Sequence, residues 1–205
     1  TAAYKIALTD RTAVGYTFAM TAITGALFGF INSSQQIFAD VFHAEAAFPA
    51  VFALIAGGIA VASIVNARLV VRLGSRKISH TALIGFTSIA AIHAGVAISG
   101  HESIWTFAVL QTLTMFCFGL IAGNFGSMAM ETMGKIAGTA ASIQGFISTI
   151  VGSLLGFAVG QQFNGTTIPM SVGFTVFGLI ALGWVLFAER GRLFRAHHAP
   201  VAAKA

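Results

Sequence analysis

Ionisable side chains are scarce in this sequence, and no carboxylate lies in the middle of a long apolar run, where a proton relay across a membrane usually needs one. The six Asp and Glu residues all lie at or beyond the ends of long apolar runs: Asp10, Asp40, Glu45, Glu102, Glu131 and Glu189. Only His93 lies well inside such a run, where an ionisable group is a candidate proton carrier. A neutral imidazole bonded to a neighbouring helix is the simpler explanation. Glu131 and Lys135, spaced i, i+4, are expected to form a local ion pair.

Arrangements that would carry out covalent or metal chemistry are not visible in the sequence. It contains no cluster of metal ligands, no phosphate-binding glycine loop and no nucleophile beside a base, so we expect no metal site, no cofactor and no enzyme. The single cysteine, Cys117, excludes an internal disulfide. His197 and His198 lie near the C-terminus, where we expect no designed metal site.

Hydrogen-bonding side chains instead gather on the faces of three of the apolar runs. The first stripe repeats at intervals of three and four residues, which places it on one helix face: Thr17, Thr21, Thr24, Phe28, Asn32 and Gln35. The later candidates are Gln111, Thr114, Met115, Phe118, Ser142 and Gln144. Polar, aromatic and thioether groups together are typical of a pocket for amphipathic ligands. We therefore expect a substrate cavity here, with hydrogen bonding within and between helices as the alternative.

Small residues repeat along another run, which predicts close helix packing. The glycines concerned are Gly145, Gly152, Gly156 and Gly160, and the last three are four residues apart. Such spacing lets helix backbones approach in lipid. Ordinary packing within one bundle is the simpler explanation, and an interface that slides during transport is the alternative.

The composition requires a membrane protein. Hydrophobic residues make up 57% of the chain and charged residues only 8%, against about 25% in soluble domains. Six runs are long enough to span a bilayer as helices, which predicts an all-α, polytopic six-helix bundle. The predicted spans are residues 13–37, 48–66, 78–99, 104–129, 138–160 and 168–188.

The Lys and Arg residues predict how the bundle is oriented. All eleven flank the spans on the side that holds both termini, so both termini are expected to be cytoplasmic. We expect the net charge of +5 to attract anionic lipid headgroups rather than nucleic acid. Residues 1–12 resemble the end of a cytoplasmic linker within a longer protein. Residues 189–205 are expected to be a basic cytoplasmic tail that is disordered over residues 196–205. Two sets of three spans with opposite starting sides permit an inverted repeat.

A family resemblance begins between the second and third spans, at Asn66–Lys77. Arg72, Gly74 and Arg76 match the second, weaker copy of the major facilitator loop motif, whereas Ala67, Val71 and Ser75 depart from it and leave out its acidic member. Three further stretches resemble the C-terminal half of bacterial Bcr/CflA-type multidrug efflux proteins: residues 30–38, 48–54 and 138–146.

The resemblance implies a drug:proton antiporter of the bacterial inner membrane that works by alternating access. Its partners would be the bilayer, an N-terminal six-helix half on the same or a separate chain, a small hydrophobic substrate and protons. The substrate cavity would be lined by Asn32, Gln35, Gln111, Thr114, Met115 and Phe118. The glycine-rich fifth span would meet the other half, His93 would lie on a peripheral helix, and the proton-binding acid would belong to the other half.

Two other functions remain open from the sequence. The chain could be a stand-alone six-helix subunit that stabilises a larger membrane complex without transport. It could also pair with itself as a homodimeric half-transporter. A polar stripe facing an aqueous cavity favours transport, whereas the same stripe buried against another protein favours the subunit.

Overall fold

The computed structural model describes residues 7–194 and, at Lys135, the backbone alone. Within this range the chain folds into six long helices, each long and apolar enough to cross a membrane. They are α2 (Arg11–Gln36), α3 (Phe48–Leu73), α4 (Ser75–Ile98), α5 (Ile104–Ala129), α6 (Ala137–Gly160) and α7 (Ile168–Ala188). Residues 1–6 of the expected linker and residues 195–205 of the expected tail lie outside the described residues.

Local signals in the sequence explain where most of these helices begin. The Asp10 side chain accepts a hydrogen bond from the Ala13 N–H and caps α2, and Ser103 caps α5 in the same way. Pro49 and Pro169 lie in the first turns of α3 and α7, where a missing N–H leaves no bond unmade. A π-helical turn, Ile37–Val41, and 3₁₀ turns at Glu45–Ala47 and Gly134–Ile136 complete the connections.

The end of α3 differs from the prediction. The helix continues seven residues past the predicted boundary at residue 66, so Arg68 and Arg72 lie on its last turns rather than in a loop. No helix breaker occurs before Gly74, whose φ of 78° reverses the chain directly into α4. Apolar content had defined the predicted span, but a helix can extend beyond the hydrocarbon into the headgroup region.

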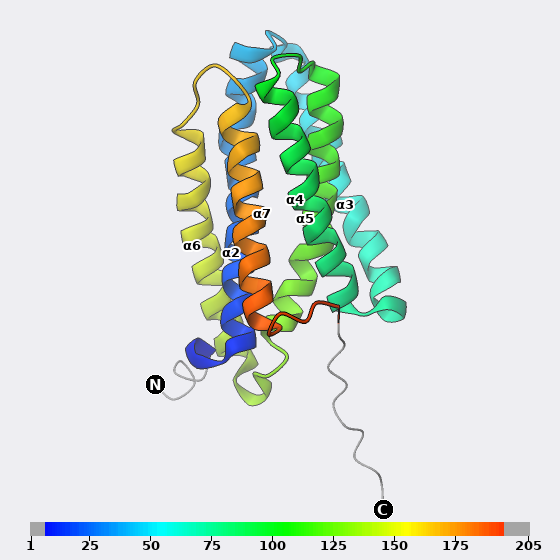
Figure 1. The fold of residues 1–205 in the computed structure, drawn as a ribbon, viewed down its shortest axis with the longest axis vertical. Helices are drawn as coiled ribbons and strands as arrows, with labels where there is room; N and C mark the ends of the chain where they lie inside the picture. The colour runs from blue at the N-terminus through cyan, green and yellow to red at the C-terminus, as the bar shows by residue number, and fades with distance from the viewer. Residues whose placement is uncertain (1–6, 195–205) are drawn as a thin grey trace, which may run out of the picture.

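The helices pack in the lateral order α6, α2, α7, α4, α5, α3, and α2 also contacts α5 at the centre (Figure 1). The contacts between helices have a twofold symmetry. If α2 is exchanged with α5, α3 with α6 and α4 with α7, each major helix–helix contact becomes another major contact. The α2–α6 pair becomes α5–α3, the α2–α7 pair becomes α5–α4, and α4–α7 and α2–α5 map onto themselves. This is the arrangement of two three-helix repeats with opposite directions, as in half of a major facilitator fold.

The core lies among α2, α4, α5 and α7, and it is rich in aromatic rings. Phe38 contacts Phe48 and Phe107 edge-on near one end, and Tyr16 contacts Phe125 near the other. By contrast, α3 and α6 are the least buried helices and α2 is the most buried. The outer faces of α3 and α6 therefore remain open to lipid or to another protein.

Glycines produce close helix approaches at two equivalent interfaces. A Cβ added to Gly156 of α6 would lie 2.5 Å from Phe28 Cβ of α2, and one added to Gly119 of α5 would lie 2.7 Å from Ala62 Cβ of α3. Only a residue without a Cβ fits at these points. A close contact at a glycine thus holds α6 against α2 and, in the same way, α3 against α5.

Candidate functional site

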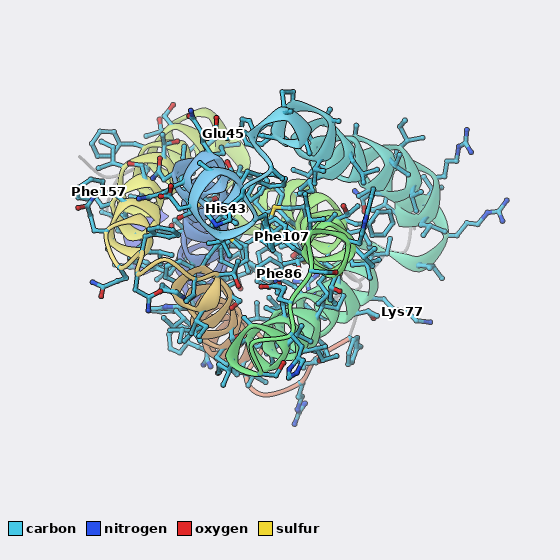
Figure 2. All side chains as sticks on the ribbon, turned by 90° about the horizontal axis from the view of Figure 1, so that it is seen from above. His43, Glu45, Lys77, Phe86, Phe107 and Phe157 are labelled. Atoms are coloured by element: carbon cyan, nitrogen blue, oxygen red, sulfur yellow. The ribbon has the colours of Figure 1, made fainter. Side chains whose placement is uncertain are left out.

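The two ends of the bundle differ in charge. We call the end that carries the α3–α4 turn, the α5–α6 connection and both described chain ends the basic end (bottom of Figure 1). Every Lys and Arg whose side chain the structure describes lies there: Arg11, Arg68, Arg72, Arg76, Lys77, Arg190 and Arg192. The opposite end carries the other three connections and is viewed directly in Figure 2.

The predicted polar stripe of α2 divides into a buried part and an exposed part. Thr17, Thr21 and Thr24 are buried, and the Thr21 hydroxyl lies within hydrogen-bonding distance of Ser148 on α6 (3.3 Å). Asn32 and Gln35, two turns further, are exposed. The first part of the stripe therefore serves packing, and only its last part reaches a surface.

The predicted cavity candidates on α5 are buried among the helices of this chain. Gln111, Thr114 and Met115 are completely buried inside the bundle, and Phe118 is only 7% exposed. The exposed positions of α5 are Trp105, Val109, Leu113, Gly123 and Ser127. The structure therefore does not bring the α5 candidates onto the surface shared by Asn32 and Gln35. The Gln111 amide forms no hydrogen bond with any residue that the structure describes.

The predicted glycine interface is also divided. Gly152 and Gly156 pack on α2 within the same bundle, and Gly160 approaches Asn32, whereas Gly145 has no neighbour within 4 Å of an added Cβ. Ser142 is exposed and Gln144 is buried on the α2 side. Gly152, Gly156 and Gly160 thus hold α6 against α2, and a contact of this helix with a second half would use other α6 positions.

A cluster of charged groups at the basic end is the most connected polar site among the described residues. The Arg76 guanidinium, in the first turn of α4, donates to both Glu131 oxygens (2.6 and 3.2 Å) and to Glu189 Oε1 (2.7 Å). Glu131 follows α5 and Glu189 follows α7. The Arg76 and Glu189 side chains are 11% and 2% exposed, so both carboxylate contacts compensate the desolvation of the guanidinium.

The cluster continues to α2 through neutral groups. The Tyr16 hydroxyl donates to Glu189 Oε1 (2.6 Å) and lies 2.9 Å from His80 Nε2, while His80 Nδ1 accepts from the Phe194 N–H (3.1 Å). A neutral His80 whose Nδ1 accepts must carry its proton on Nε2, so it donates to the Tyr16 oxygen. Arg190 and Gly191 have positive φ and turn the chain so that Phe194 reaches α4. Four helices and the segment after α7 are therefore joined in one network.

This network revises two predictions from the sequence. Glu131 pairs with Arg76 of another helix, while the side chain of Lys135, its expected partner, lies outside the described set. The acidic member missing from the Arg72–Gly74–Arg76 motif is replaced by Glu131 and Glu189, which are 55 and 113 residues from Arg76. Arg72 itself is exposed on the last turn of α3.

An open pocket of about 340 Å³ adjoins this cluster, between the α3–α4 turn and the end of α5. Its lining includes Arg76, Lys77, Ser127, Glu131 and Phe194. Tyr16 and His80 were not singled out in the sequence, and Glu189 was noted only as one of the carboxylates at the ends of apolar runs. The sequence did contain one signal for the two carboxylates, because Glu131 and Glu189 both follow spans that end on the basic side. Nothing near them in the sequence indicates that both contact Arg76.

The site around His93 lies toward the opposite end and is smaller. His93 Nε2 is 2.6 Å from Glu102 Oε1, and the Thr167 hydroxyl donates to Glu102 Oε2. The His93 ring also packs edge-on against Phe107. The expected partner for His93 was a neighbouring helix, whereas the structure provides the connection that follows its own helix. Groups of three or more possible metal ligands are absent from the part of the chain that the structure describes.

Comparison with known proteins identifies one kind of relative. The chain is 25% identical over 184 residues to the uncharacterized MFS-type transporter YdgK of Bacillus subtilis (strain 168), over 88% of this chain and 44% of that protein. The chain thus spans less than half the length of the relative it matches. No protein-family model matches the chain, and no solved structure matches it. The similarity and the membrane helices support a relationship to MFS-type transporters.

Proposed function

We propose that this chain forms the C-terminal half of a secondary active transporter of the major facilitator type, which exports hydrophobic or amphipathic compounds in exchange for protons. The similarity to an MFS-type transporter supports the transporter class, and the two three-helix repeats support a rocking mechanism. The second half would come from the same or a separate chain.

The observation that carries the proposal is a pair of exposed polar side chains on α2, between the poorly buried helices α3 and α6. Asn32 and Gln35 are exposed on α2, and Asn32 Cβ lies 3.3 Å from the Cβ that Gly160 of α6 would carry. Figure 2 shows this end of α2 flanked by α6 on one side and by α3 on the other. A second six-helix unit packed on α3 and α6 would enclose an amide-bearing cavity. Amides surrounded by apolar surface suit an amphipathic ligand.

The proton part of the mechanism would depend on the other half. The described carboxylates all lie at helix ends or in connections, and none lies in the middle of a described helix. A proton-binding acid near the membrane midplane would therefore be supplied by the second half, where its protonation would compete with the export substrate.

A transport assay tests the proposal directly. The natural gene product that contains this chain is reconstituted into liposomes, and proton-driven movement of a fluorescent amphipathic dye is measured. Asn32→Leu is expected to lower the rate about fivefold, because one lost hydrogen bond is worth about 1 kcal/mol. Gln162→Leu is the matched control, since Gln162 is an exposed amide at the same end of the bundle.

Each outcome has a distinct meaning. Absence of proton-driven dye movement in the parent protein would refute transport and favour a six-helix subunit that stabilises a larger complex. Normal transport by the Asn32→Leu variant would refute the proposed cavity face while leaving the transporter class intact.

A further inference from the structure

A buried imidazole–carboxylate pair lies near the end of the bundle opposite the basic end. His93 belongs to α4, five residues before the helix ends at Ile98, and Glu102 lies in the connection to α5. Their side chains are 1% and 7% exposed, and His93 Nε2 is 2.6 Å from Glu102 Oε1. Thr167, the N-cap residue of α7, donates its hydroxyl to the other carboxylate oxygen. The pair therefore links α4, the start of α5 and the start of α7.

The charge around this pair makes the imidazole its natural counterion. Every Lys and Arg with a described side chain lies at the basic end, so none is available to compensate a Glu102 carboxylate. The other titratable groups at this end are Asp40, His43, Glu45 and His101, and all four are exposed. Figure 2 labels His43 and Glu45 on the α2–α3 connection and Phe107, whose ring contacts His93, nearer the centre. A buried anion without a cation is far more costly than a paired one.

Helix ends favour one arrangement of the proton within the pair. Glu102 directly precedes Ser103, the N-cap of α5, and also contacts the N-cap of α7. Helix N-termini stabilise anions, and C-termini, such as the nearby end of α4, stabilise cations. Asp40 and Glu45 add negative potential at the same end. These fields favour negative charge on the Glu102 side of the pair and positive charge on the imidazole side.

We propose that His93 and Glu102 together form a proton-binding site that holds one proton as a buried imidazolium–carboxylate pair and fastens α4 to the first turns of α5 and α7. Release of this proton would leave a net negative charge in a site closed to water, so release requires these three helix ends to separate or hydrate. The site needs only the fold described above. Its test is therefore independent of the transport proposal.

Nuclear magnetic resonance of the whole chain in lipid nanodiscs tests the site. Ile92–His93 is the only Ile–His step in the sequence, so labelling Ile carbonyl carbon and His nitrogen and carbon identifies His93 without a substitution. At neutral pH we expect both ring nitrogens of His93 to be protonated. A neutral His93 ring beside an ionised Glu102 in the parent protein would overturn the proposal. A neutral His93 ring in the parent, together with an unchanged His93 spectrum in Glu102→Gln, would also overturn it.

Two variants separate the pair from its surroundings. Glu102→Gln removes the negative charge and is expected to convert His93 at neutral pH from a ring with both nitrogens protonated to a neutral ring. Glu45→Gln removes an exposed carboxylate from the same end and is expected to leave the His93 spectrum unchanged. Equal effects of the two variants would show that the general field of this end, not the pair, binds the proton. If Glu102→Gln does not fold, the parent spectrum still decides.

Discussion

The contact between Gly156 and α2 allows a strong test of the packing. In Gly156→Ala the new Cβ would lie 2.5 Å from Phe28 Cβ and 2.6 Å from the Gly29 backbone nitrogen. Neither atom can rotate away, because one is a Cβ and the other belongs to the helix backbone. Normal carbon contacts are about 3.5–4.0 Å, so α6 must move from α2 by about 1 Å.

The expected cost follows from these distances. Overpacking costs about 1–3 kcal/mol, and these rigid contacts at 2.5 and 2.6 Å should cost the upper part of that range, about 2–3 kcal/mol. The better helix propensity of Ala returns about 1 kcal/mol, which leaves a destabilisation of about 1–2 kcal/mol. Gly145→Ala is the matched control on the same helix, because its Cβ would meet nothing within 4 Å. This variant should be neutral or slightly stabilising.

The single cysteine provides the assay. Cys117 is buried, so a fluorogenic maleimide reacts with it only as the bundle unfolds on heating. The unfolding midpoint of Gly156→Ala is expected to fall by roughly 2–8 °C, at about 2–4 °C per kcal/mol for a chain of this size. Equal midpoints for the two glycine variants would refute the close α2–α6 approach.

Two further predictions concern the charged cluster and the exposed α2 face. Arg76→Gln removes the guanidinium bound to buried Glu189 and should cost on the order of 3 kcal/mol, whereas Lys77→Gln, at an exposed position, should change stability by less than about 0.5 kcal/mol. Thermal unfolding measures both, and equal midpoints would contradict the network. Cysteine at Gln35 should react with a water-soluble maleimide in the folded protein while cysteine at Thr114 stays protected; rapid labelling at Thr114 would show that the α5 face is wrongly placed.

The charged cluster also bears on which helices would move together. Arg76 holds the ends of α5 and α7 to α4, and Tyr16 adds α2. These four helices form the well-buried core, while α3 and α6 lie outside it. We therefore expect the four core helices to move as one body at the basic end, with adjustments concentrated in α3 and α6.

Much of the fold follows from local features of the sequence. Long apolar runs must form helices in lipid because their backbone groups find no other partners there, which is why α5 and α7 begin and end at the predicted residues. Pro49 and Pro169 mark helix starts for reasons contained in one turn of chain. The end of α3 was missed because hydropathy reports the hydrocarbon boundary, whereas Gly74 ends the helix.

Which helix faces pack against one another is visible only in the tertiary structure. Almost every side of α5 is apolar, so its sequence carries no periodic signal that separates the buried Gln111 and Thr114 from the exposed Val109 and Leu113. Arg76 finds its carboxylates 55 and 113 residues away, and Tyr16 meets Glu189 across 173 residues. Such pairs form because packing brings helix ends together, and no local pattern encodes that approach. The sequence by itself determined six helices and a basic end; their packing determined the networks at both ends.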